Sequence, residues 1–201
     1  MVKIGPKFKI AKRLNASIFE KTQTKAFMLS KERSAKNKRG RRGNSDYQRQ
    51  LIEKQKLRLT YGLSERQFSN YVAVALASKV PQAALFIGLE TRLDSIIYRM
   101  GLTPTRRAAR QMVSHGHITV NGRRTTIPSQ KIHKGDVIAV REGSRQGSLF
   151  GNLAEKLKEH KMPSWVSFDA SKMEGTLTAD PASSDQDSTA DIGAVFEFYT
   201  R

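Results

Sequence analysis

The segment Arg92–Val140 constrains the fold of this 201-residue chain more than any other stretch. Apolar residues at positions 93, 96, 97 and 100 have the i, i+3, i+4, i+7 spacing of one helix face. Gly101 suits a left-handed helix end, and Thr103 before Pro104 suits the start of a second helix. An Asn-Gly pair at 121–122, after an Ile-Thr-Val run, predicts a tight hairpin. We therefore predict two short helices followed by a hairpin.

The second helix and the hairpin carry a group of arginines. At helical spacing, apolar positions 108, 109, 112 and 113 gather on one side. Arg107 and Arg110 fall on the other side, with Arg106 at the seam, and Arg123 and Arg124 follow the turn. A solvated helix face would explain the helical arginines equally well. Because guanidinium groups are always charged and planar, the combined set is a candidate site for phosphates.

The net charge is +18, from 36 Lys and Arg against 18 Asp and Glu, and it is unevenly distributed. Residues 1–66 hold 19 basic and 5 acidic side chains, a net of +14. Residues 67–148 hold 12 and 4, a net of +8, whereas residues 149–201 hold 5 and 9, a net of −4. This pattern favours nucleic acid as the partner, with an anionic membrane surface as the second choice.

The composition excludes several classes of site. The chain has no cysteine, which excludes disulfides and thiolate metal sites. His115 and His117 have metal-like spacing but no third ligand nearby, so we predict no metal and no cofactor. No run of 18 apolar residues and no apolar signal core at the N-terminus is present, so we expect no membrane span and a cytoplasmic location.

The remaining segments are assigned from their local patterns. Residues 1–44 look irregular and basic, and we expect them to become ordered on a partner. Ser45 and Ser64 begin capping boxes, and Pro81 separates the second of these helices from another over 82–89. We expect strands near 135–140 and 163–168, a helix near 150–157, an acidic loop over 178–191 and a C-terminus that is tied down. The aromatic residues assigned to the core are Tyr47, Tyr61, Phe68, Tyr71 and Trp165.

Long collinear motifs resemble the bacterial and organellar small-subunit ribosomal protein number four family. They are IGPKFKIAKR, SDYQRQLIEKQKLRLTYGLSERQFSNY, RLDSIIYRMG, TRRAARQMVSHGHITVNGRR, IPSQKIHKGDVIAV and PSWVSFDASKMEG. The resemblance covers nearly the whole chain and implies an α+β fold of two lobes. One lobe is α-helical, from the N-terminal half plus the C-terminal tail, and the other is an α/β RNA-binding lobe of two helices and a β-hairpin sheet. The domains expected are 1–89, 90–170 and 171–201.

The resemblance also implies function. A family member binds small-subunit ribosomal RNA directly and early in assembly, at a multi-helix junction, without catalysis. It lies near the channel through which mRNA enters, contacts small-subunit protein five at an interface linked to decoding accuracy, and lies near protein three. Many relatives carry metal-binding cysteines in the N-terminal segment, whereas residues 26–42 here have none, which agrees with the prediction of no metal.

Under this resemblance, the candidate RNA-binding residues are basic or polar side chains of both lobes. They are Lys7, Lys9, Lys12, Arg13, Lys38, Arg39, Arg41, Arg42, Lys54, Lys56, Arg58, Arg66, Arg92, Arg99, Arg106, Arg107, Arg110, Gln111, His115, His117, Asn121, Arg123 and Arg124. The cluster 38–42 is the one that the resemblance places near the entering mRNA.

Two other function classes use the same RNA-binding fold. An RNA-modifying or tRNA-charging enzyme would need a catalytic domain, and the sequence shows neither a Gly-rich nucleotide loop nor an acid/base constellation. The run Arg92-Leu93-Asp94 resembles the catalytic motif of pseudouridine synthases. Leu93, however, belongs to the apolar helix stripe, so we interpret Asp94 as structural. A freestanding ribosome-rescue factor would lack the helical lobe that residues 45–62 indicate.

Overall fold

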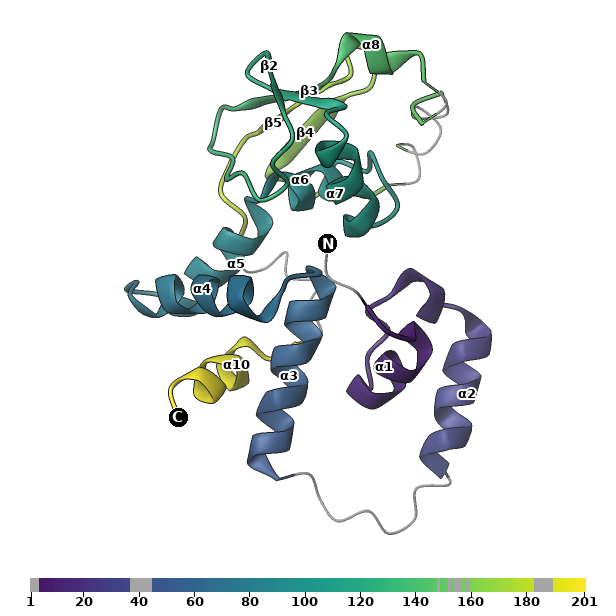
Figure 1. The fold of residues 1–201 in the computed structure, drawn as a ribbon, viewed down its shortest axis with the longest axis vertical. Helices are drawn as coiled ribbons and strands as arrows, with labels where there is room; N and C mark the ends of the chain where they lie inside the picture. Colours follow the sequence, from purple (N-terminus) through teal and green to yellow (C-terminus); the bar gives the residue numbers. More distant parts are fainter. Residues whose placement is uncertain are drawn as a thin grey trace. The chain divides into compact units, whose positions relative to one another are not determined.

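The computed structural model describes residues 4–36, 45–147, 149–151, 153, 157, 160–182 and 190–201. They form two compact units, one from Met1–Gln82 with Asp187–Arg201 and one from Ala83–Gln186 (Figure 1). The first is helical and the second contains a five-stranded sheet, so the α+β prediction is confirmed. We call them the helical unit and the sheet unit. The domain limits expected from the sequence stay a prediction.

The N-terminal part of the helical unit is helical where we expected an irregular segment. It contains α1 (Lys7–Leu14), a 3-10 turn η1 (Glu20–Thr22) and α2 (Lys25–Lys36), so the expectation for residues 1–44 is wrong over its described part. Ala11, Phe19 and Phe27 are buried together in a small core. These apolar residues are far apart in sequence, and only folding brings them together. The local sequence pattern therefore reveals the basic charge of the segment but not its core.

The middle of the helical unit follows the predicted capping signals. Ser45 caps α3 (Asp46–Thr60), where its Oγ accepts a hydrogen bond of 3.3 Å from the Gln48 N–H. Ser64 and Gln67 form a full capping box at the start of α4 (Glu65–Leu76). The helix predicted over 82–89 is confirmed as α5 (Pro81–Glu90), which is longer by one residue at each end.

The C-terminal helix α10 (Ile192–Tyr199) packs against α3, beside which it lies in Figure 1. The buried ammonium of Lys54 is 2.7 Å from Glu65 Oε1 and 4.2 Å from the centre of the Phe198 ring. The Tyr199 hydroxyl donates to the same Glu65 oxygen at 2.9 Å. These contacts confirm that the aromatic C-terminus is tied down.

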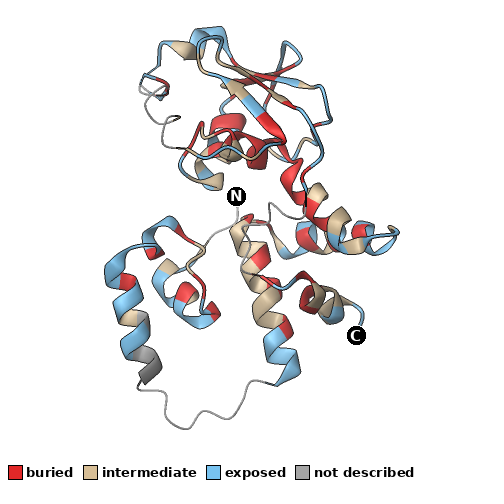
Figure 2. Ribbon diagram, turned by 180° about the vertical axis from the view of Figure 1, so that it is seen from behind, coloured by how far each residue is buried: buried red, intermediate tan, exposed pale blue. Residues whose placement is uncertain are grey.

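The sheet unit has the antiparallel strand order β2-β1-β3-β5-β4. The strands are β1 (Ile118–Val120), β2 (Arg123–Thr125), β3 (Val137–Val140), β4 (Val166–Asp169) and β5 (Glu174–Leu177). Two helices, α6 (Leu93–Arg99) and α7 (Arg106–Ser114), share one buried apolar cluster with alternate residues of the strands. Figure 2 shows this concentration of buried residues in α6 and α7. A short helix α8 (Glu142–Arg145) follows β3.

The turns of the sheet unit agree with the sequence signals. Asn121 and Gly122 have φ of 50° and 77°, as a type I′ hairpin turn requires. Gly101 and Gly116 both have positive φ where helices end. The cap of α7, however, was predicted wrongly. Thr105, not Thr103, accepts the hydrogen bond from the Ala108 N–H, at 3.1 Å.

The reason lies in the residues between the two helices. Thr103 is buried, and its hydroxyl donates to the Thr105 carbonyl at 3.2 Å. This bond keeps Pro104 outside the helix, which begins two residues later than expected, at Arg106. Two threonines on either side of a proline give the same local signal, so sequence spacing alone favoured the first of them.

The aromatic residues assigned to the core are buried with two exceptions. Tyr61, Phe68 and Trp165 are 3% exposed or less, as predicted. Tyr71 is half-buried, whereas Tyr47 is 50% exposed, so its assignment to the core is wrong. The Tyr47 ring lies 5.6 Å from that of Phe198, on the outside of the contact between α3 and α10.

The expected helix near 150–157 lies only partly within the described residues. There, positions 153 and 157 are helical. Phe150 and Leu153 belong to the buried cluster of the sheet unit, and Leu157 packs against it.

Docking of α10 should depend on pH through Glu65. Burial raises the pKa of the Glu65 carboxyl, but hydrogen bonds from Lys54 and Tyr199 and the charges of Lys54 and Arg58 outweigh it, so the pKa is lowered from its ordinary 4.5. Ionised Glu65 therefore stabilises the fold above pH 4.5, and this contribution is lost as pH falls through the lower folded-state pKa.

Urea unfolding of the wild type and Glu65→Gln over a range of pH measures this effect. The difference in free energy of unfolding should be constant above pH 4.5 and shrink below it. Glu32→Gln, at an exposed position of α2, is the matched control. A Glu65→Gln difference that does not change with pH would contradict the role given to this carboxylate.

Candidate nucleic-acid interface

A buried carboxylate at the end of α5 binds two of the candidate arginines. Glu90 is fully buried, and its two oxygens accept hydrogen bonds from Arg99 Nε and Nη2 at 3.0 and 2.9 Å. Arg106 Nη2 adds a bond of 3.0 Å, and its guanidinium lies 4.5 Å from the centre of the Tyr98 ring. Glu90 thus joins the last residue of α6 to the first residue of α7.

A second buried carboxylate repeats this arrangement at the start of α6. Asp94 is 1% exposed, and Arg92 binds it through Nε and Nη2 at 3.0 and 2.9 Å. From α7, Arg110 places Nε and Nη2 at 2.9 and 2.7 Å from Asp94 Oδ2. The backbone N–H of Asp94 also donates to the Pro128 carbonyl at 3.1 Å. Asp94 is therefore held in ion pairs, which is the structural role interpreted from the sequence.

We call these six residues the carboxylate–arginine cluster: Glu90, Asp94, Arg92, Arg99, Arg106 and Arg110. Two carboxylates neutralise half of the four guanidinium charges. The arginine side chains are only 4 to 16% exposed, so each is held in one position before any ligand binds. Buried charges of this kind are tolerated because each is paired and hydrogen-bonded.

Exposed polar side chains lie on α7 and the hairpin beside this cluster. Arg107, Gln111 and His115 follow one another at spacings of four residues, so they share a face that runs from the first turn of α7 to its C-cap. Arg123 and Arg124 are exposed on β2 and, as neighbours on a strand, point to opposite sides of the sheet, Arg123 with Val120 and Arg124 with Thr119. We call these five residues the exposed arginine face. They can reach a large anionic ligand without breaking an ion pair among the described residues.

The turn between α7 and β1 connects the two parts of this face. Arg124 Nη2 donates to the His115 carbonyl at 3.3 Å. Gly116 permits this contact, because a Cβ at that position would overlap the Arg124 guanidinium. The His115 and His117 rings lie 6.0 Å apart, and His117 Nδ1 is 3.0 Å from the Ser144 hydroxyl.

Asn121 has a structural role in the hairpin. Its side-chain amide donates to Asp136 Oδ1 at 2.9 Å, and its Oδ1 accepts from the Val137 N–H at 2.9 Å. The backbone N–H of His133 and the Asn121 side chain both bond Asp136 and hold the pKa of its carboxyl below the ordinary value. Asn121 is exposed, but its polar atoms are already used within the turn.

The candidates of the helical unit fall into two groups. Lys54 and Arg58 both contact Glu65, and Lys56 is 2.6 Å from Glu53, so these three charges are paired inside the unit. The side chains at the surface are Lys7, Lys9, Lys12, Arg13 and Arg66, of which Lys7 is half-buried. Of these, Lys12 donates to the Ser30 hydroxyl at 2.8 Å. Lys38, Arg39, Arg41 and Arg42 lie outside the described residues.

Sequence reasoning missed Glu90 and the pairing that it produces. The one available signal was a single carboxylate at the end of the apolar run ALFIGL, where an unpaired charge would be costly to bury. Within the described ranges, no group of three or more His, Cys, Asp or Glu side chains could hold a metal ion. In the same residues, no helix is long and apolar enough to cross a membrane.

Comparison with known proteins finds two adjacent family matches, which meet at residue 91, nine residues beyond the end of the first segment of the helical unit at Gln82. A family described as ribosomal protein S4/S9 N-terminal domain matches residues 3–91, and the S4 domain family matches residues 91–138. Proteins named small ribosomal subunit protein uS4 are similar over the whole chain. Those of Limosilactobacillus reuteri and Roseiflexus castenholzii are 42% identical, and that of Acinetobacter baylyi is 40% identical, with 98% of each chain covered.

Removing one carboxylate of the cluster should destabilise the sheet unit. Asp94→Asn keeps the shape of the side chain but removes the buried negative charge that pairs with the Arg92 and Arg110 guanidinium groups. We expect a loss of about 3–5 kcal/mol in the free energy of unfolding, measured by urea denaturation. The matched control is Asp180→Asn at an exposed position. Equal stability of the two variants would show that the Asp94 pairs do not hold α6 to α7.

Proposed function

The chain belongs to the small ribosomal subunit protein uS4 family, and on this basis we propose that it is a structural constituent of the small ribosomal subunit that binds ribosomal RNA directly. Members of this family are structural proteins and not enzymes, so the expectation that the chain lacks catalysis is confirmed. The observation that carries the proposal is the exposed arginine face beside the carboxylate–arginine cluster.

The chemistry of this face suits an RNA backbone. Arginine forks bind phosphate oxygens in a bidentate manner, and each neutralised phosphate releases a bound counterion. Side chains cannot read the narrow major groove of A-form RNA, so recognition rests on shape, phosphates and ribose hydroxyls. Gln111 and His115 add polar groups that suit ribose and phosphate contacts. The arginines of the carboxylate–arginine cluster add positive charge at fixed positions beside the exposed arginine face.

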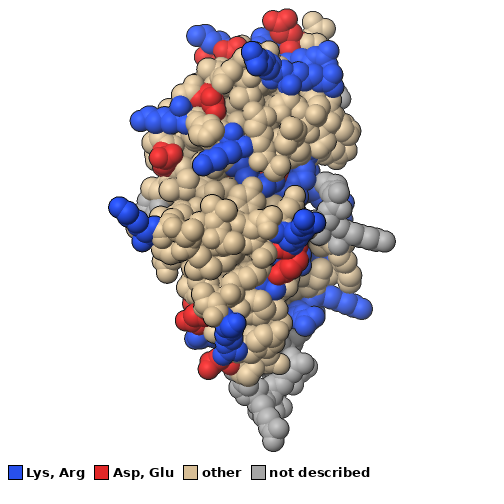
Figure 3. All heavy atoms as spheres, turned by 60° about the vertical axis from the view of Figure 1, so that its left-hand side comes forward, with Lys and Arg blue, Asp and Glu red and all other residues tan. Residues whose placement is uncertain are grey.

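The charge of the helical unit supports a second area of RNA contact. Residues 1–66 carry a net charge of +14, larger than the +8 of residues 67–148. On the face drawn in Figure 3, basic side chains are more frequent than acidic ones. A large polyanion bound to both units would use both sets of charges.

Further parts of the proposal rest on the family resemblance. They are binding at a multi-helix rRNA junction early in subunit assembly, a position near the channel where mRNA enters, and a contribution to translational accuracy through small-subunit protein five. A contact with protein three near the mRNA channel belongs with them, as does a cytoplasmic location in the subunit. The basic N-terminal surface supports a position near RNA in general.

The exposed arginine face can be tested apart from the cluster. Arg107, Arg123 and Arg124 should be replaced with alanine together, because none of them binds Glu90 or Asp94. Binding to a small-subunit rRNA transcript should weaken, and its dependence on the logarithm of salt concentration should flatten by roughly one unit of slope per lost phosphate contact.

The control for this variant removes the same charge elsewhere on the sheet unit. Lys134, Lys161 and Lys172 are exposed and lie outside the face. Their combined replacement with alanine should leave most of the affinity and slope. Equal losses in the two triple variants would show that total charge, and not this surface, determines binding.

A further inference from the structure

The sheet of this unit has an open face, of which the exposed arginine face uses only Arg124. Along β1, Ile118 and Val120 are buried against the helices, so Thr119 between them points to the opposite side. The registers place Arg124, Thr119, Ala139, Glu174 and Asp169 in one row across all five strands. The row is basic on β2 and acidic on β5 and β4.

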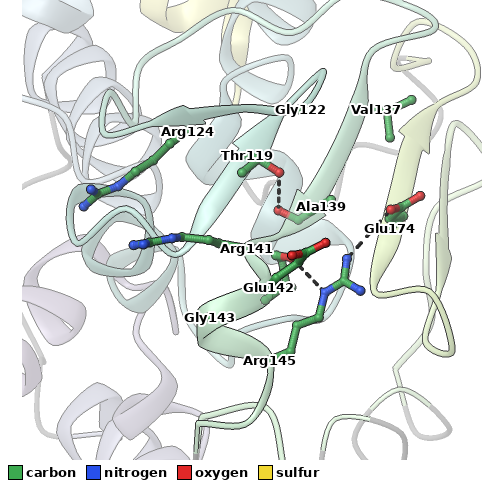
Figure 4. Close-up of a pocket in the computed structure, with 11 residues that line it drawn as sticks. Thr119, Gly122, Arg124, Val137, Ala139, Arg141, Glu142, Gly143, Arg145 and Glu174 are labelled. Atoms are coloured by element: carbon green, nitrogen blue, oxygen red, sulfur yellow. Dashed lines mark hydrogen bonds and ion pairs between the residues drawn. The ribbon is translucent and has the colours of Figure 1, made fainter.

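A groove of about 570 Å³ lies over this row (Figure 4). Its floor contains Thr119, Val137 and Ala139, whose side chains are short. The residues after β3 form its wall, including Arg141, Glu142 and Arg145. Figure 4 shows Arg124 and Arg141 extending to the same side, away from Glu174, whereas Arg145 points towards Glu174.

The three arginines of the groove differ in how far their charge is already compensated. Arg145 donates from Nε to the Val140 carbonyl at 3.1 Å, and its Nη2 lies 3.8 Å from Glu174 Oε1. The side chain of Arg141 is exposed and has no hydrogen bond or ion pair with the described residues. Its backbone N–H donates to the His117 carbonyl at 2.9 Å, which fixes where the side chain begins.

The basic end of the groove is continuous with the exposed arginine face. Arg124 belongs to both, and its guanidinium is bonded to the His115 carbonyl. Arg141 is bonded through its backbone to His117, whose ring is 6.0 Å from that of His115. A ligand that follows α7 past this turn therefore meets Arg124 and Arg141 next.

We propose that this groove binds the phosphodiester backbone of the same ribosomal RNA, with Arg141 as a phosphate contact that extends the exposed arginine face onto the open side of the sheet. The proposal rests on the function proposed above. It adds a contact at Arg141, which lies beyond residues 91–138, the range that matches the S4 domain family. The RNA strand enters at β2 and ends its contact before the carboxylates of Glu174 and Asp169.

The residue types on the open face favour the backbone over the bases. Sheets that bind single-stranded bases present aromatic rings for stacking. The open-face positions here are Arg124, Thr119, Val137, Ala139, Glu174, Thr176, Ser167 and Asp169. None of these residues is aromatic. The guanidinium groups of Arg124 and Arg141 suit two successive phosphates. A protein strand of mixed charge would instead have to pair with both the basic and the acidic end of the groove.

Single substitutions in the full chain test this site. Arg141→Ala should weaken binding to a small-subunit rRNA transcript roughly tenfold and lower the salt slope by about one unit, as expected for one charge-assisted contact. Glu142→Gln removes an exposed negative charge from the same wall and should strengthen binding. Arg145→Ala is the matched control, since its charge is compensated by Glu174, and should change affinity and slope less than Arg141→Ala does.

The outcomes separate this inference from the proposed function. Loss of binding in the Arg107, Arg123 and Arg124 triple variant, with Arg141→Ala equal to the wild type, would overturn the groove and leave the function standing. Equal effects of Arg141→Ala and Arg145→Ala would also overturn it. Normal RNA affinity with loss of a neighbouring protein from sedimented subunits would assign the groove to a protein instead. A wild-type chain that does not bind the transcript would overturn the proposed function itself.

Discussion

The sheet unit depends on two buried carboxylates, each of which binds two arginines from different places in the chain. Glu90 holds Arg99 and Arg106, and Asp94 holds Arg92 and Arg110. Four guanidinium groups this close would repel one another without the two negative charges between them. The same bonds join the end of α5, both ends of α6 and two residues of α7, so charge pairing and helix packing are one arrangement.

This arrangement changes how the positive charge of the chain should be interpreted. Arginine side chains that are 4 to 16% exposed and bonded to a carboxylate act mainly through their fixed electrostatic field, and less by binding a ligand directly. The groups that can bind a phosphate directly are the exposed side chains on α7 and β2 and, after β3, the side chain of Arg141. A preorganised surface loses less side-chain entropy on binding, which favours a structural protein that must hold RNA in one shape.

The sequence predicts those parts of the fold that depend on local backbone chemistry. The Asn121-Gly122 hairpin, the positive φ at Gly101 and Gly116, and the caps at Ser45 and Ser64 follow from such signals. Contacts between distant residues were not predictable in this way. The burial of Phe19 with Phe27, and the pairing of Arg106 with Glu90, depend on which segments meet after folding. The sequence therefore predicts the arginines as a group of candidate RNA-binding residues, which stays a prediction, while their division into paired and exposed sets required the structure.

The most direct test of this account is the hydrogen exchange of arginine Nε–H groups in the free protein, measured by NMR. Arg92, Arg99 and Arg110 each bond a buried carboxylate through Nε, so their Nε–H groups should exchange slowly with water in the absence of RNA. Arg107 and Arg123, which are exposed, should exchange rapidly under the same conditions. Similar fast exchange for all five would contradict the claim that the carboxylates hold the arginines in place before RNA binds.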